Sequence, residues 1–139
     1  ANTLLAVIIT TLPAVGTLTL SGTPVTAGQA ITAANLGNLV YTPAPNGNGA
    51  GYATFTFQVQ DNGGTANGGA DTDPTPNTIT LNVTAVNDAP VNSVPGAQST
   101  VETGTLTFSS ANGNLVSVDD IEATTVSVTL TVTTGTVTL

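Results

Sequence analysis

The stretch TFTFQVQ, residues 54–60, alternates polar and apolar side chains without a break. Successive side chains of a β-strand point to opposite faces, so this period of two predicts a strand with one buried and one wet face. Phe55, Phe57 and Val59 are therefore expected to line a core. The Thr and Gln side chains between them are expected to face water.

The same alternation recurs in residues 78–84 and again in residues 126–132. Residues 4–11 are apolar on both faces, which predicts a central strand covered on each side. Clusters of Gly, Asn and Pro separate these segments, and no stretch shows a helical period. The fold class predicted is all-β, an antiparallel sandwich. Shorter strands are expected at residues 17–20, 39–42, 105–108, 115–118 and 136–139.

The charge balance excludes several classes of function. The 139 residues include no Lys, Arg, His or Cys, while Asp and Glu number eight and give a net charge of -8. Without cations, binding to nucleic acid or to anionic lipid is not expected. Nucleophilic triads and His/Cys zinc sites lack their essential atoms.

Two further expectations follow from the sequence. Asp119 and Asp120 are adjacent and would point to opposite faces of a strand, which does not suit a paired-carboxylate enzyme. The chain is therefore predicted not to be an enzyme. The apolar run at residues 4–9 is far shorter than the roughly 20 residues of a membrane-spanning helix, so no membrane insertion is expected.

An internal repeat is visible when the chain is aligned with itself. Residues 2–10 and 16–20 resemble residues 123–131 and 135–139, each pair being a long strand, a Gly turn and a short strand. The chance alternative is that Thr-rich strands all look alike. The repeat predicts a sandwich domain at 1–89 that lacks its N-terminal strands, and the first half of a following repeat at 90–139. Such an incomplete sandwich should be unstable alone or pair with a neighbour.

Three segments carry a family resemblance. YTP at 41–43, leading through NGNG at 46–49 to FTFQVQDNGG at 55–64, resembles the closing half of bacterial cadherin-like and Ig-like tandem repeats. VTAVNDAPV at 83–91 resembles the joint between such repeats. The opening half of a repeat is similar to the region from residue 106 to residue 139.

This resemblance implies a large surface adhesin, of the biofilm-associated or type I secreted kind, whose tandem sandwiches form a stalk. Cadherin joints bind calcium through Asp- and Asn-rich segments, and the matching positions here are Asp61, Asn87 and Asp88. The match is incomplete. Ala85 stands where the first cadherin Asp would be, and the NDAP segment at 87–90 is one residue short.

The acidic residues independently suggest a cation. They lie in predicted loops and strand ends. Carboxylates that converge without Lys or Arg either have a raised pKa or require a cation from outside. Calcium takes six to eight oxygen ligands, including Asn side chains and backbone carbonyls. The alternative is that these are solvated loop acids that maintain solubility. The predicted ligands near one end of the sandwich are Asp61, Asp71, Asp73, Asn87 and Asp88, with Asp119 and Asp120 at a related site in the next unit.

The function predicted from these observations is mechanical: a repeat of a secreted, extracellular bacterial adhesin or matrix protein, whose calcium-stiffened stalk spaces a binding tip from the cell surface. The alternative is a subunit of a self-assembling extracellular filament, in which residues 90–139 complete the sandwich of an identical neighbouring chain by strand addition. A monomer in solution favours the first function and a regular polymer the second.

Overall fold

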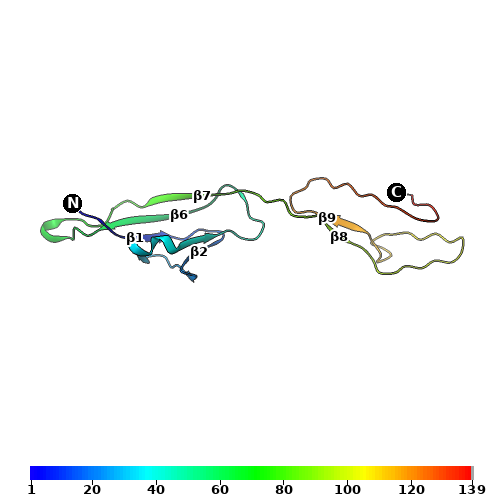
Figure 1. The fold of residues 1–139 in the computed structure, drawn as a ribbon, viewed down its shortest axis with the longest axis horizontal. Helices are drawn as coiled ribbons and strands as arrows, with labels where there is room; N and C mark the ends of the chain where they lie inside the picture. Colours follow the sequence, from blue (N-terminus) through cyan, green and yellow to red (C-terminus); the bar gives the residue numbers. More distant parts are fainter. Residues whose placement is uncertain (139) are drawn as a thin grey trace. The chain divides into compact units, whose positions relative to one another are not determined.

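The computed structural model describes residues 1–138, which form two compact units, Ala1–Val86 and Asn87–Leu139. We refer to them as the N-terminal and the C-terminal unit (Figure 1). The N-terminal unit contains β1 (Leu4–Thr11), β2 (Thr17–Leu20), β3 (Thr23–Pro24), β4 (Ala30–Thr32), η1 (Ala33–Asn38), β5 (Leu39–Thr42), β6 (Gly49–Asp61), η2 (Ala66–Gly68) and β7 (Asn77–Val83). The C-terminal unit contains β8 (Val91–Ser93) and β9 (Ser117–Asp119).

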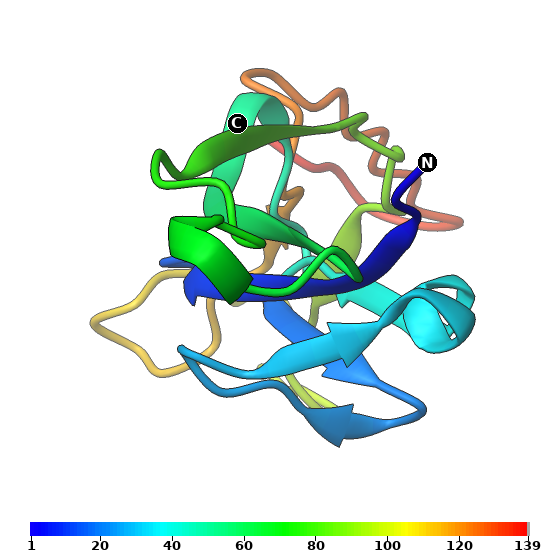
Figure 2. The ribbon, with the colours of Figure 1, turned by 90° about the vertical axis from the view of Figure 1, so that its left-hand side faces the viewer.

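The N-terminal unit is an antiparallel β-sandwich, as predicted. One sheet has the strand order β4-β1-β6-β7 and the other has the order β3-β2-β5. Figure 2 shows this unit end-on, with its sheets as separate layers. The segment that decides the fold lies in β6, where Phe57 is paired with Ile9 of β1 and Phe55 with Ile79 of β7.

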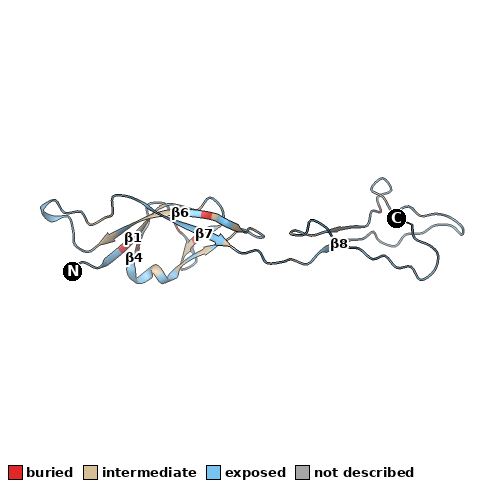
Figure 3. Ribbon diagram, turned by 90° about the horizontal axis from the view of Figure 1, so that it is seen from above, coloured by how far each residue is buried: buried red, intermediate tan, exposed pale blue. Residues whose placement is uncertain are grey.

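The core lies between the two sheets and is small. Its fully buried centre is Ile9 and Ile31, and Leu18, Val25 and Phe55 pack around them. Burial of each such side chain contributes about 1.5–3 kcal/mol. The expected core position of Phe55 is confirmed, and Phe57 is half-buried against this cluster. The expectation for Val59 is wrong, because its side chain lies outside the cluster and is 39% exposed. Figure 3 shows buried positions in red on β1 and β6.

The expectation for residues 4–11 is only partly correct. β1 is a central strand, with β4 on one side and β6 on the other. Its first residues, however, are not covered, because Leu4 and Leu5 remain exposed. On the wet face, the Thr56 hydroxyl shares hydrogen bonds with the hydroxyls of Thr10 and Thr11 at 2.6 and 2.7 Å. Threonine thus stabilises this face without charge.

The C-terminal unit contains much less strand than its sequence predicts. β8 and β9 pair antiparallel, with Val91 opposite Asp119. The strands predicted at 105–108 and 126–132 are absent, as is the described part, 136–138, of the predicted final strand; Leu139 lies outside the described residues. An alternating segment becomes a strand only when another strand hydrogen-bonds to it, and these segments have no such partner among residues 1–138.

No helix within residues 1–138 has the length and apolar character that crossing a membrane requires.

Candidate functional site

Three predicted ligands, Asp61, Asp71 and Asp73, lie where β6 ends and the chain returns toward β7. The Asp61 N–H donates to the Asp71 carbonyl oxygen at 2.8 Å, and the Asp73 N–H donates to the Val59 carbonyl oxygen at 2.9 Å. Residues 71–73 therefore continue the sheet alongside β6. The structure brings these three acidic residues to neighbouring positions, although Asp71 is ten positions after Asp61 in the sequence.

Each of the three carboxylates accepts hydrogen bonds from neutral donors. Asp61 and Asp73 accept from backbone N–H groups two residues on, which is typical of Asx turns. The donors are Gly63 N at 2.6 Å for Asp61, Gln60 Nε2 at 3.2 Å and Thr72 Oγ1 at 3.0 Å for Asp71, and Thr75 N at 3.0 Å and Asn77 Nδ2 at 2.7 Å for Asp73.

An open pocket of about 520 Å³ lies among these acidic residues. Its lining also includes Asn2, whose amide nitrogen lies 3.4 Å from Asp61 Oδ2, and the side chain of Gln60. Carboxylate and amide oxygens are the ligands that calcium takes in proteins. Chemically, this arrangement suits a hydrated cation better than an anion or an apolar ligand.

The remaining predicted ligands belong to the C-terminal unit. The Asp88 N–H donates to Glu122 Oε2 at 3.0 Å, and the amide of Asn87 donates to the Asp88 carbonyl oxygen at 2.8 Å. Asp120 Oδ1 accepts from the N–H groups of Glu122 at 3.1 Å and Ala123 at 2.7 Å. The bond between Asp88 and Glu122 brings the two ends of the segment 88–122 together.

Asp119 and Asp120 differ in their surroundings, as expected for adjacent residues at the end of a strand. Asp119 is exposed and lies in β9 opposite Val91, whereas Asp120 is half-buried and caps the turn that follows. Glu122 is the residue that the sequence interpretation missed. Its spacing of two from Asp120 was the available signal, because an Asx turn at Asp120 positions the next residues.

The structure divides the five ligands that were predicted near one end of the sandwich. Asp61, Asp71 and Asp73 form the first group. Asn87 and Asp88 belong to a second group with the predicted ligand Asp120 and with Glu122, while Asp119 is exposed in β9. β7 starts beside the first group and carries the chain to the other end of the N-terminal unit before Asn87 is reached. Among residues 1–138, no three acidic side chains are close enough to hold a metal ion by themselves. Amide, carbonyl or water oxygens would have to complete either site.

The antiparallel strands, arranged in two facing sheets, define the class as an all-β Ig-like sandwich domain. Residues 2–73, more than half of the chain, match the model of the bacterial Ig domain family, and the chain belongs to this family. No curated protein and no solved structure matches it significantly. Bacterial Ig domains are structural, non-enzymatic repeats that are typical of surface proteins.

Proposed function

We propose that this chain is a structural repeat of a bacterial extracellular adhesin or matrix protein, and that it helps to space a binding tip from the cell surface. One observation carries the proposal. A bacterial Ig domain is followed, after a short joint, by a second unit whose residues 123–131 repeat the sequence pattern of β1. Tandem Ig-like units connected by short joints are suited to an extended spacer.

The location follows from this function and can be tested directly. An antibody raised against the chain should label intact cells of the bacterium that produces it. Labelling only after the cells are lysed would contradict an extracellular role.

We further propose that calcium binds at the acidic groups and stiffens the joint. The support is the charge balance: eight carboxylates, no Lys or Arg, and two clusters in which acidic and amide side chains lie together. A ligand that binds only the folded state stabilises it by RT ln(1 + [L]/Kd), about 2.7 kcal/mol at a hundred times the Kd. Scanning calorimetry with calcium and with chelator should therefore give different melting temperatures.

A matched set of variants separates calcium binding from a general effect of charge. Asp88→Asn combined with Glu122→Gln should reduce the calcium-dependent shift. Glu102→Gln removes a carboxylate from outside both groups and should leave that shift unchanged. Equal melting temperatures of the unmodified chain in calcium and in chelator would disprove calcium binding, without affecting the proposed structural role.

Stiffening of the joint has its own readout. The chain lacks cysteine, so Thr54→Cys in the N-terminal unit and Thr107→Cys in the C-terminal unit would carry the only two spin labels. Electron–electron resonance should give a narrower distance distribution in calcium than in chelator. An unchanged width would contradict stiffening.

A further inference from the structure

The chain contains several Asn-Gly pairs, and this dipeptide can modify itself. The backbone nitrogen of the Gly attacks the side-chain Cγ of the Asn before it, because Gly has no side chain to hinder the approach. A new N–Cγ bond forms, the bond from Cγ to Nδ2 breaks, and the Gly N–H proton leaves with this nitrogen as ammonia. Water then opens the cyclic succinimide at either of its carbonyl groups, giving Asp or iso-Asp. The pairs are at 46–47, 48–49, 62–63, 67–68 and 112–113.

The rate of this reaction depends on how freely both reacting groups can move. The Gly nitrogen and the Asn Cγ must approach to about 3–3.5 Å before a bond can form. A hydrogen bond that holds either group has to break first, which slows the reaction roughly 2- to 12-fold for each bond. Because all the pairs share one dipeptide sequence, the folded structure decides which of them reacts first.

Asn62 is held at both reacting groups, although its side chain is exposed. Its Oδ1 accepts from the Thr3 N–H at 2.9 Å. The Gly63 N–H donates to Asp61 Oδ1 at 2.6 Å. Two hydrogen bonds must therefore break before this pair can react, so it should react at least about fivefold more slowly than an unrestrained pair.

Asn112 is held in the same way. Its Nδ2 donates to the Thr107 carbonyl oxygen at 2.9 Å. The Gly113 N–H donates to the Ser110 carbonyl oxygen at 3.1 Å. This pair should consequently be slowed as much as the pair at Asn62.

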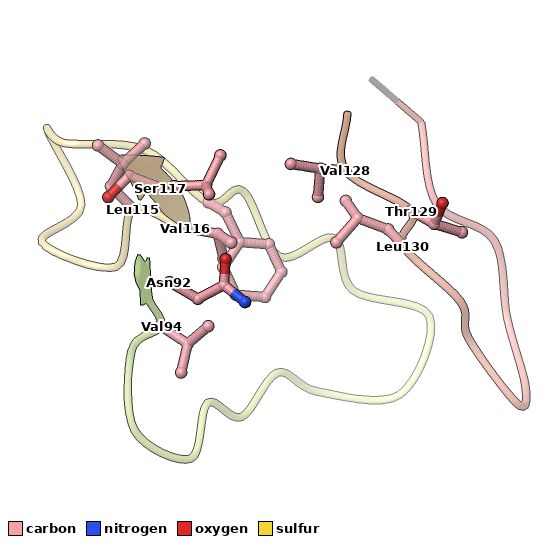
Figure 4. A pocket seen from close by; sticks show the side chains of 10 residues that line it. Asn92, Val94, Leu115, Val116, Ser117, Val128, Thr129 and Leu130 are labelled. Atoms are coloured by element: carbon pink, nitrogen blue, oxygen red, sulfur yellow. The ribbon is translucent and has the colours of Figure 1, made fainter. Parts of the chain in front are cut away.

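The turn around Asn112 is also restrained at its two ends. Phe108, before the turn, and Leu115, after it, line the same open apolar pocket of about 430 Å³. Figure 4 shows Leu115 and Val116 among the side chains around this pocket. Opening of the turn would disturb these apolar contacts, which adds to the protection of Asn112.

The two pairs within residues 46–49 are held less completely. The Gly47 N–H donates at 3.0 Å to the carbonyl oxygen of the residue three positions before it. Gly47 also packs closely against Tyr52, because a Cβ at Gly47 would overlap the Tyr52 ring. Asn48 Nδ2 donates to the Asn46 carbonyl oxygen at 3.2 Å. Each of these pairs thus has one hydrogen bond to break.

Asn67 is the least restrained of these residues. Its side chain is exposed and takes part in no hydrogen bond within residues 1–138. The Gly68 N–H likewise donates to no side chain, and to no backbone oxygen outside the single turn η2. A Cβ at Gly68 would meet nothing within 4 Å, so no other segment packs against this side of the backbone.

We propose that Asn67-Gly68 is a self-modifying site, where the folded protein first converts Asn to Asp and iso-Asp. The product adds one negative charge to the net charge of -8, because the Asp carboxyl is ionised at neutral pH. The new carboxylate lies in the loop between Asp61 and Asp71 of the first acidic group. Iso-Asp also lengthens the backbone of this loop by one methylene. This inference goes beyond the proposed structural role and does not depend on it.

Peptide mapping by mass spectrometry tests which residue reacts first. The chain lacks Lys and Arg, so pepsin replaces trypsin. Asn67 and Asn112 are a matched pair, since Ala precedes and Gly follows both. In the folded chain at neutral pH, Asn67 should convert at least about fivefold faster than Asn112. In urea the two residues should convert at similar rates, because no fold restrains them.

Two variants test the physical reason for the selectivity. Asn67→Gln removes the reactive side chain, so the first acidic product on ion-exchange chromatography should disappear. Asp61→Ala removes the acceptor of the Gly63 N–H and should speed conversion of Asn62 roughly 2- to 12-fold. Conversion of Asn112 should stay the same in both variants.

Two results would overturn the proposal. If Asn67 converts no faster than Asn112 in the folded chain, the exposed loop is not the reactive site. If Asp61→Ala leaves the rate at Asn62 unchanged, and the folded and the unfolded chain convert their Asn residues at the same relative rates, the fold does not select the site.

Discussion

Residues 55–59 in the N-terminal unit and residues 126–132 in the C-terminal unit alternate apolar and polar side chains in the same way. The first segment lies within β6, with β1 on one side and β7 on the other, and the second has no strand partner. Phe55 in the first segment is 5% exposed, whereas Val128 in the second is 52% exposed. Two segments of nearly identical pattern therefore have different secondary structure. The first has hydrogen-bonding partner strands and the second has none, so the difference comes from the surroundings and not from the segment itself.

The largest expected difference between the units concerns their phenylalanines. Phe55 is 5% exposed in the core, and Phe108 is 48% exposed beside the pocket of the C-terminal unit. Phe55→Ala should cost about 3–5 kcal/mol of unfolding free energy, because it leaves a cavity. Phe108→Ala should leave the urea midpoint of the chain nearly unchanged, because this side chain is already half exposed. Equal shifts of the two midpoints would show that the C-terminal unit has a core of its own.

Substitution of two corresponding glycines should give a smaller difference in stability between the two units. Gly16 and Gly135 are the turn glycines of the two copies of the internal repeat, with φ of 74° and 86°. A Cβ at Gly16 would meet the Tyr41 hydroxyl and lie 2.6 Å from the Thr42 carbonyl oxygen, whereas a Cβ at Gly135 would meet nothing within 4 Å.

Gly16→Ala should therefore combine backbone strain of about 1–2 kcal/mol with a steric clash, while Gly135→Ala should cause the strain alone. Urea denaturation of the two variants measures the difference. If both variants unfold at the same urea concentration, the two turns are packed equally closely. This result would contradict the proposed difference between the units at these glycines.

Among the described residues of the C-terminal unit, 87–138, the one buried side chain is polar. Asn114 accepts from the Ser109 N–H at 2.9 Å and donates to Gln98 Oε1 at 3.1 Å. Asn114→Ala should cost about 1–2 kcal/mol of local stability, because the Ser109 N–H loses its partner. Amide exchange at Ser109 should become faster, while exchange in β6 stays as it was. Faster exchange in both places would mean that the two units unfold together.

The smallest effect is expected at Tyr41. Its hydroxyl donates to the Val15 carbonyl oxygen at 2.9 Å. Burial, and secondarily the neighbouring Tyr52, raises the pKa of Tyr41, so folding favours the protonated phenol. Its contribution to stability is present below pH 10, the ordinary value, and is lost as the pH rises through the raised value. Tyr41→Phe should lower the melting temperature slightly at neutral pH and weaken its fall at high pH; an unchanged alkaline profile would contradict this role.

The sequence predicted the N-terminal unit well because each of its strands has a hydrogen-bonding partner within that unit. β1, β2, β5 and β7 begin and end within one residue of the predicted segments, and each pairs with an antiparallel neighbour. The same reasoning was wrong at 105–108 and 126–132, where the pattern is present and the pairing is missing. Periodicity reports which face a strand would bury, and it contains no information about whether a partner is available.

The candidate site was less predictable for a related reason. Each acidic residue was identified correctly as lying in a loop or at a strand end. Which of them lie close together, however, depends on the lengths and directions of the strands between them. The length of β7 places Asp73 and Asn87 in different groups. The bond between Asp88 and Glu122 joins residues that are 34 apart in sequence, and no short motif reports such a contact.

The central claim is that the alternating segments of the C-terminal unit lack only partner strands. Hydrogen–deuterium exchange tests it most directly. Residues 55–59 should be protected, whereas residues 105–108 and 126–132 should exchange rapidly. Protection of residues 105–108 or 126–132 that matches the protection of residues 55–59 would contradict the claim.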